Sequence, residues 1–143
     1  IPKRDWSSDV CSSDLGRCYA ELGNSREAEK AFHMAAGEAP NTREPWSELA
    51  MLMYRQHRWE ECFAYAMRCL KITDRLAVYT CDPAVWGHQV HDLAAISAYY
   101  LGLLDKAKEQ AEIAIQLTPD DQRLWSNLAL IEDAIRSKGE KAA

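Results

Sequence analysis

Small and aromatic side chains recur along this chain at helical spacing, in successive pairs of segments. The first pair shows the order small, aromatic, turn glycine, alanine, aromatic, alanine and proline. These positions are Gly16, Tyr19, Gly23, Ala28, Phe32, Ala35 and Pro40. No run of alternating apolar and polar residues competes with this pattern, so we expect two antiparallel helices, a tight turn between them and a proline after the second.

The same order returns 34 positions later. The second unit is marked by Trp46, Leu49 and Ala50 in its first helix and by Trp59, Cys62, Ala66, Cys69 and Leu70 in its second. The third unit carries Leu93, Ala94, Ala95 and Tyr99, followed by Gly102, Ala107, Ala111, Ala114 and Pro119. A further step of 34 residues reaches Trp125, Leu128 and Ala129, which predict a final helix.

The residue types at these positions suit close packing of helices. Alanine at Ala28 and Ala107 lets two backbones approach. Gly23 and Gly102 provide the left-handed residue that a tight turn needs at the lowest steric cost. We expect Trp46 to be buried, filling the gap between neighbouring helix pairs.

This order of residues resembles the tetratricopeptide repeat. The resemblance covers nearly all of residues 16–143. It implies an all-α fold, an α-solenoid of about three tetratricopeptide helix pairs plus a final helix. It also implies a concave groove lined by the first helix of each pair, and a role in binding proteins or peptides.

One step between repeats is longer than the others. It measures 45 residues, and the additional ones fall at about residues 75–87. This insert is too apolar for a solvated loop. We expect it to pack against the ridge of Ala94, Ala95 and Ala98, with Asp82 capping a short helix that begins at Pro83.

The helix ends also have sequence signals. Thr42 is a candidate cap for the helix that has Pro45 in its first turn, and Asp121 is a candidate cap for the last helix. We expect this last helix to end near Arg136 and the polar tail after it to fray.

The repeat geometry projects a set of side chains into the concave groove. The candidate binding residues are Glu44, Met51, Tyr54, Arg55, Asp92, Tyr99, Tyr100 and Arg123, with Ser47, Gln89, Ile96, Ser126, Leu130 and Asp133 on the same face. Tyrosines beside arginine suit peptide binding. An equally open alternative is that the tyrosines only cover the seam between helices.

The groove departs from one pattern of the tetratricopeptide family. The family's basic clamp for C-terminal carboxylates needs Lys and Asn on successive first helices. Ser47 and Met51 stand at those positions, and Arg123 and Asn127 are at most a remnant. Recognition of a chaperone's C-terminal tail is therefore not expected.

Composition limits the partners. The chain has 143 residues, a net charge of −5 and no basic cluster, which argues against nucleic acid. No apolar run approaches the length that crosses a bilayer. The cysteine spacing does not suggest a disulfide framework, which favours a reducing cytoplasm. We expect no cofactor. The partner is a protein, a peptide or a missing catalytic domain, and a homodimer is allowed.

Cys81, His88 and His91 form the one cluster of side chains in the sequence that could bind a metal or take part in catalysis. Two histidines three residues apart can share a helix face as metal ligands do, which would make a metal-dependent enzyme. The favoured interpretation is structural. His91 takes the repeat position of Trp46 and Trp125, so we expect a packing residue with one hydrogen bond, and neither a metal site nor a catalytic residue.

The first fifteen residues have a separate origin in our interpretation. Residues 5–15 read DWSSDVCSSDL and resemble the translation of a common short-read sequencing adapter. We therefore expect residues 1–15 to be an artefactual segment, residues 16–143 to be the solenoid domain, and the natural sequence upstream of Gly16 to be missing.

A narrower resemblance concerns the parent protein. The stretches EAPNTREPWSELA, YTCDPAVWGHQVHDLAAISAYYLG and AIQLTPDDQRLWSNL resemble the helical tail of bacterial and phage glycosyltransferases of the family 2 type. This resemblance implies a C-terminal fragment of such an enzyme that carries no catalytic residue itself. The alternative is a stand-alone adaptor that binds a peptide in its groove.

Overall fold

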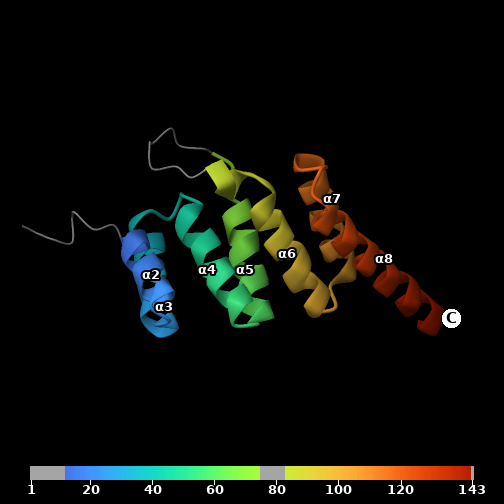
Figure 1. The fold of residues 1–143 in the computed structure, drawn as a ribbon, viewed down its shortest axis with the longest axis horizontal. Coiled ribbons are helices and arrows are strands. Elements are labelled where there is room, and N and C mark those ends of the chain that lie inside the picture. Colours follow the sequence, from blue (N-terminus) through green and yellow to red (C-terminus); the bar gives the residue numbers. More distant parts are fainter. Residues whose placement is uncertain (1–11, 75–82, 143) are drawn as a thin grey trace, which may run out of the picture.

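The chain folds as a row of antiparallel helix pairs. The computed structural model describes residues 12–74 and 83–142, and within these ranges it contains seven α-helices, one short 3-10 helix and no strand. In chain order these elements are α2 (Ser12–Glu21), α3 (Ser25–Glu38), α4 (Glu44–Arg55), α5 (Trp59–Leu70), η1 (Pro83–Trp86), α6 (His88–Tyr100), α7 (Leu104–Leu117) and α8 (Gln122–Ala142). Figure 1 shows α2 with α3, α4 with α5 and α6 with α7 as successive pairs, followed by α8. The predicted α-solenoid of three helix pairs and a final helix is confirmed.

The turn inside each pair depends on one left-handed residue. Gly23 and Gly102 have φ of 79° and 78°, as their turn positions predicted. The equivalent residue of the middle pair is His57, with φ of 56°. A side chain at positive φ is uncommon, although histidine tolerates it better than most residues.

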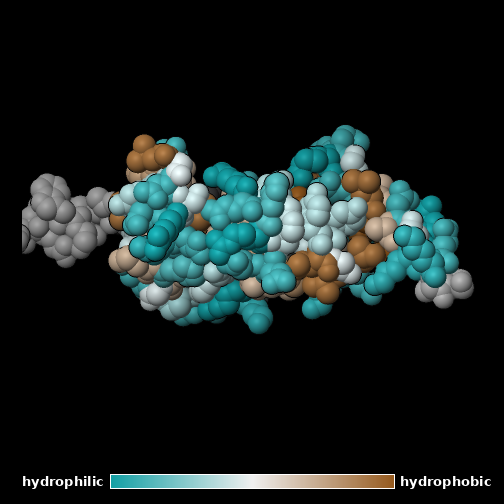
Figure 2. Space-filling model, turned by 90° about the horizontal axis from the view of Figure 1, so that it is seen from below, coloured by the Kyte–Doolittle hydropathy of each residue, from teal (hydrophilic) through white to brown (hydrophobic). Residues whose placement is uncertain are grey.

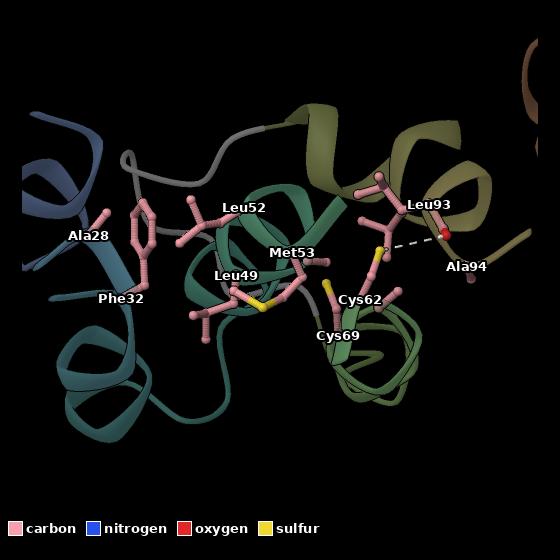
Figure 3. Packing of buried hydrophobic residues seen from close by; sticks show 12 residues of the cluster. Ala28, Phe32, Leu49, Leu52, Met53, Cys62, Cys69, Leu93 and Ala94 are labelled. Carbon is pink, nitrogen blue, oxygen red and sulfur yellow. Dashed lines mark hydrogen bonds between the residues drawn. The ribbon is translucent and has the colours of Figure 1, made fainter. Parts of the chain in front are cut away.

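A continuous apolar core runs through the pairs. Its largest cluster joins α3, α4, α5 and α6, and includes Phe32, Leu49, Met53, Cys62 and Cys69, all fully buried (Figure 3). Two smaller clusters extend the core to α7 and α8. Each pair therefore rests on its neighbours, as expected of a repeat protein.

Trp46 is less buried than the sequence suggested. It is only partly buried, its Nε1 donates to the carbonyl of Pro40 at 3.4 Å, and the Arg68 guanidinium lies 4.9 Å from its ring centroid. Trp125 repeats the arrangement, with Nε1 donating to the carbonyl of Pro119 at 2.8 Å. The expectation of full burial was wrong, because Phe32, Leu49 and Met53 already fill the interior.

Two expectations for helix ends gave opposite results. Asp121 caps α8 as predicted, with Oδ1 accepting a hydrogen bond from the Arg123 amide at 3.0 Å. Thr42 does not cap α4. Its hydroxyl instead donates to the carbonyl of Ala39 at 2.8 Å, and α4 begins at Glu44 with Pro45 in its first turn.

The last helix is also longer than expected. It continues beyond Arg136 and includes Ala142. The tail consists mostly of residues with good helix propensity, and the single glycine, Gly139, is not enough to stop the helix. None of the described helices combines the length and apolarity that crossing a bilayer requires.

The insert is held to the solenoid by a buried arginine. Arg43, at the start of α4, is only 7% exposed. Its Nε donates to the carbonyl of Ile72 at 2.8 Å, its Nη1 donates to the carbonyl of Val85 at 3.2 Å, and its guanidinium lies 3.9 Å from the centroid of Trp86. Burial lowers the pKa of Arg43, while the nearby thiol of Cys69 and carboxylate of Glu44 oppose this. We call these four residues the Arg43 cluster: Arg43, Ile72, Val85 and Trp86.

The described part of the insert agrees with the expectation as far as it goes. η1 begins at Pro83, as predicted, Val85 is buried, and η1 contacts α6. Ala94 packs in the cluster that includes Cys62, and Ala95 and Ala98 pack with residues of α7 and α8. The expected packing of the whole insert against these alanines stays a prediction. Asp82 and the rest of residues 75–82 lie outside the described residues.

Part of the segment ascribed to the adapter lies in a helix. Residues 12–15 form the first turn of α2, where Ser13 is buried and the Ser12 hydroxyl donates to Glu38 Oε1 at 3.0 Å. Residues 1–11 lie outside the described residues.

Candidate functional site

The concave side of the solenoid contains a groove between α4, α6 and α8. Its volume is about 540 Å³. Aromatic, aliphatic and cationic side chains line it: Tyr54, Arg55, His57, Trp59, Ala95, Ile96, Tyr99, Tyr100, Arg123, Asn127, Leu130 and Ile131. We call it the α4–α6–α8 groove. Its size is in the range of ordinary ligand pockets.

Stacked aromatic rings form one wall of the groove. Trp59 stacks on Tyr100, with ring centroids 4.3 Å apart and an interplanar angle of 9°. His57 stacks on Trp59 at 5.2 Å and 11°. Tyr54 meets Trp59 edge-on at 5.9 Å, and Tyr99 meets Tyr100 edge-on at 5.5 Å. These five residues are the aromatic wall.

The positions of the helix ends explain why the rings meet. His57 lies in the turn between α4 and α5, Trp59 is the first residue of α5, and Tyr100 is the last residue of α6. Because α5 and α6 are antiparallel neighbours, the start of one lies beside the end of the other. The wall therefore closes the groove at the turns.

Sequence reasoning missed His57 and Trp59 as groove residues. Trp59 was assigned to the second helix of its unit, which normally faces away from the groove. A signal was nevertheless present. His57 takes the repeat position of Gly23 and Gly102, and a non-glycine residue at a turn position that favours positive φ is uncommon, which distinguishes this turn from the other two.

One carboxylate near the groove is fully engaged. Asp92 is buried, and its Oδ2 lies 2.7 Å from Arg123 Nη2. Its Oδ1 accepts a hydrogen bond from the Asn127 side chain at 3.4 Å. The hydrogen bond that Arg123 donates to the Asp92 carboxylate raises the pKa of Arg123 above its ordinary value. The Asp92–Arg123 pair therefore braces α6 against α8 and leaves little charge of its own in the groove.

Arg55 is the other cation of the groove. It is exposed on α4, and it forms no ion pair with any residue in the ranges the structure describes. Its guanidinium is thus available to an anionic group of a ligand.

The candidate binding residues separate into two groups. Tyr54, Arg55, Tyr99, Tyr100 and Arg123 line the groove, together with Ile96 and Leu130. Asp92 lies beneath Arg123, as its ion pair requires.

The remaining members of the projected set lie outside the groove. Met51 packs against the largest core cluster, and Glu44 lies in the first turn of α4, where its carbonyl accepts from the Ser47 hydroxyl at 3.0 Å. The Ser126 hydroxyl donates to the carbonyl of Gln122, and Asp133 pairs with Arg136 at 2.8 Å. Gln89 is exposed.

The histidines of the candidate metal cluster have separate partners. His91 Nδ1 lies 2.7 Å from Gln110 Oε1, which is the single hydrogen bond predicted for it. His88 Nδ1 lies 2.9 Å from the Thr118 hydroxyl. Cys81 lies outside the described residues, and no group of three metal-ligating side chains occurs elsewhere in the part that the structure describes.

Comparison with known proteins identifies the fold. No protein-family model and no curated protein matches the sequence. Among solved structures, the first TPR domain of the human RPAP3 protein is similar at 15% identity, with a TM-score of 0.74 and coverage of 94% of this chain and 97% of that one. The first TPR of Spaghetti (RPAP3), bound to an HSP90 peptide, gives 15% identity, a TM-score of 0.71 and coverage of 87% and 93%.

A third similar structure is that of MamA, at 16% identity and a TM-score of 0.72, covering 90% of this chain and 64% of that one. Such low identities establish the fold alone. The chain has the tetratricopeptide solenoid fold.

Proposed function

We propose that this chain is a protein-interaction domain that binds a peptide segment of another protein in the α4–α6–α8 groove. The observation that carries the proposal is the aromatic wall beside Arg55, in a groove of about 540 Å³. Aromatic and arginine side chains are enriched where proteins bind one another most tightly. A peptide offers the apolar side chains and carboxylates that such a surface recognises.

The exposure of Tyr100 favours binding over the alternative that the tyrosines only seal the seam between helices. Its ring stacks on Trp59, yet the residue remains 59% exposed. A residue that only seals a seam would be expected to bury most of its surface. The stack holds the ring in one orientation, which reduces the entropy lost when a ligand binds against it.

Similar folds bind peptides. The Spaghetti domain is bound to the HSP90 peptide SRMEEVD, and the second TPR domain of human RPAP3 is in complex with an HSP70 peptide. These complexes support a peptide as the class of ligand, although this chain lacks the family's Lys and Asn clamp and its preferred sequence is expected to differ.

Selection from a displayed library of random dodecapeptides tests the proposal. Peptides selected on the purified protein are synthesised, and their affinity is measured by fluorescence anisotropy. We expect Tyr100→Ala and Arg55→Ala each to weaken binding by about ten-fold. Leu117→Ala is the matched control, because Leu117 is a large apolar residue outside the groove that is 50% exposed, against 59% for Tyr100. Recovery of no binding peptide, or equal affinity of all variants, would refute the proposal.

A second candidate concerns the parent protein. The resemblance of three stretches to the tail of family 2 glycosyltransferases supports a domain attached to a missing catalytic domain. In that case the groove or another face contacts the catalytic domain or a second copy of the chain. Genomic sequence upstream of Gly16 distinguishes the candidates. A catalytic domain there supports the enzyme fragment, and further repeats support the adaptor. The same sequence also tests whether residues 1–15 are artefactual.

A further inference from the structure

A second hollow lies just beyond the aromatic wall. It has a volume of about 530 Å³ and lies between the α6–α7 turn, the start of α7 and the last part of α8. Its side chains combine aliphatic and charged groups, chiefly Leu103, Leu104, Asp105, Lys106, Ile135 and Lys138. Figure 2 shows hydrophobic patches on this face over the α6–α8 end of the molecule. We call it the α8 hollow.

The α8 hollow and the α4–α6–α8 groove adjoin each other. On α8, Ile131 lines the groove and Ile135 lines the hollow, which is a separation of about one helical turn, or 6 Å. On the other side, Tyr100 belongs to the groove and Gly102 to the hollow. Leu103 is 41% exposed at this junction. Helix α8 is thus a common wall of both hollows.

The charge of this surface is opposite to that of the chain. Four cationic side chains line the two hollows: Arg55, Arg123, Lys106 and Lys138. Two acidic groups accompany them, Asp105 in the lining and Asp92 in the ion pair with Arg123. The surface therefore carries +2, while the whole chain carries −5, so the remainder carries −7. An acidic ligand is attracted to this end and repelled elsewhere.

The opposite end of the concave side offers less to such a ligand. There, Arg17 on α2 is paired with Glu48 on α4 at 2.9 Å and with Asp14 at 3.5 Å. Arg17, the one basic residue within α2, is therefore matched by two carboxylates. A ligand that fills the groove gains more by extending along α8 than by extending toward α2.

We propose that the groove and the α8 hollow form one binding track for an extended, acidic and apolar segment of a partner protein. The ligand follows α8 past the α6–α7 turn and places its acidic side chains against Arg55, Lys106 and Lys138. The track runs from Arg123 to Gly139, which is about 24 Å along the helix. An extended chain of about seven residues spans that length. This inference rests on the proposed function, because it specifies the ligand of the same groove.

Charge reversal at the far end of the track tests the inference. The probes are the dodecapeptides selected on the wild-type protein, and affinity is again measured by anisotropy. We expect these peptides to combine acidic with aliphatic or aromatic residues, and Lys138→Glu to weaken binding by about five-fold or more. We expect Leu103→Ala to weaken it by about three-fold or more.

Lys30→Glu is the matched control, because it changes the net charge equally at an exposed position of α3. Equal weakening by Lys30→Glu and Lys138→Glu would reduce the effect to net charge and overturn the inference. Peptides with free and amidated C-termini should bind equally, since the track recognises side-chain carboxylates. Loss of binding on amidation would overturn it as well.

The outcomes separate this inference from the proposed function. If Tyr100→Ala and Arg55→Ala abolish binding while Lys138→Glu and Leu103→Ala leave it unchanged, the peptide site stands and the extended track is wrong. If none of the four variants changes the affinity, or if no peptide is selected, both proposals fail.

Discussion

At the scale of single residues, the absence or presence of one side chain decides how helices meet. Gly16 on α2 faces the ring of Phe32, and a Cβ built at Gly16 would lie 2.5 Å from that ring. Gly37 is also in a helix, but a Cβ there would meet nothing within 4 Å. The two glycines therefore have opposite roles, since one is required by packing and the other only weakens a helix.

Alanine at these two positions should change stability in opposite directions. Gly37→Ala should stabilise the fold by about 0.5–1 kcal/mol through helix propensity. Gly16→Ala should destabilise it by about 1–3 kcal/mol, because the core must move to accept the methyl group. Urea unfolding followed by circular dichroism measures both. A stabilised Gly16→Ala would show that α2 is not packed against Phe32 as described.

The two buried thiols predict how stability depends on alkaline pH. Burial raises the pKa of Cys62 from 9.0 to about 11 and that of Cys69 from 9.0 to about 12. Because the folded pKa values exceed the unfolded one, the stabilisation is complete below pH 9 and is lost as the pH rises toward the folded values. By about pH 10.5 each thiol should have reduced the free energy of unfolding by about 2 kcal/mol.

Unfolding in urea at pH 8 and at about pH 10.5 measures this loss. The control is the double variant Cys62→Ala/Cys69→Ala, whose stability should decrease less between the two pH values, although it starts from a lower stability. An equal decrease in both proteins would assign the alkaline effect to other groups.

At the scale of elements, the helix pairs could be predicted and several of their contacts could not. The small and aromatic positions of the repeat require antiparallel helices with close backbones, so the pairs and the turn glycines followed from the sequence. The Arg43 cluster did not, because no local pattern distinguishes an arginine that will be buried by a segment about 40 residues away. Trp46 was placed too deep for a related reason. Periodicity indicates the face of a helix, but the neighbouring side chains decide how deeply a residue is buried.

The candidate site shows the same division. The first helices of the repeats predicted Tyr54, Arg55, Tyr99, Tyr100 and Arg123 for the concave side. Asp92 and Arg123 were both projected there, but the sequence did not show that they would neutralise each other. His57 and Trp59 reach the groove through a turn and a helix start, where helical periodicity does not apply.

The Arg43 cluster predicts a local effect on the insert. Arg43→Ala would remove the donors to the Ile72 and Val85 carbonyls and the cation beside Trp86, which should destabilise the fold by about 2–4 kcal/mol. Arg43→Lys should not restore it, because an ammonium lacks the planar donor geometry. Hydrogen exchange should accelerate in η1 by more than in α7. Uniform acceleration would indicate that the arginine supports the whole solenoid equally.

At the scale of the whole molecule, the core is continuous but each contact is local. Helices pack on their own partner and on the adjacent pair, so the domain behaves as a short one-dimensional stack. The groove and the aromatic wall lie toward its C-terminal half. Changes at the N-terminal end should therefore affect stability without changing the binding surface.

Removal of residues 1–11 tests the interpretation of the N-terminal segment. If this segment derives from an adapter, it was never selected to pack, and its removal should change the Tm by less than about 2 °C. Removal of residues 1–14 should lower the Tm further, because Ser13 is buried in α2. Differential scanning calorimetry of both truncated proteins provides the measurement. A large decrease after the shorter truncation would contradict the artefactual origin.

Three backbone carbonyl groups occupy the same position in successive repeats, and each accepts a hydrogen bond from a side chain. In the repeat with the insert, the donor is Arg43. The carbonyls of Pro40 and Pro119 accept a hydrogen bond from the tryptophan six positions later, at Trp46 and Trp125. The equivalent position in the third repeat is Val85, whose carbonyl accepts from Arg43. Arg43 thus replaces a tryptophan donor that the third repeat lacks, since His91 stands at the tryptophan position.

Loop length and residue 43 should therefore be inherited together. A homologous chain with the ordinary spacing of 34 residues would lack the segment that covers the Arg43 guanidinium, so nothing would require an arginine at this position. Such a chain should have a tryptophan in place of His91, because its carbonyl at the Val85 position would need another donor. Engineering the short connection into this chain should therefore be tolerated better when His91 is exchanged for tryptophan in the same step.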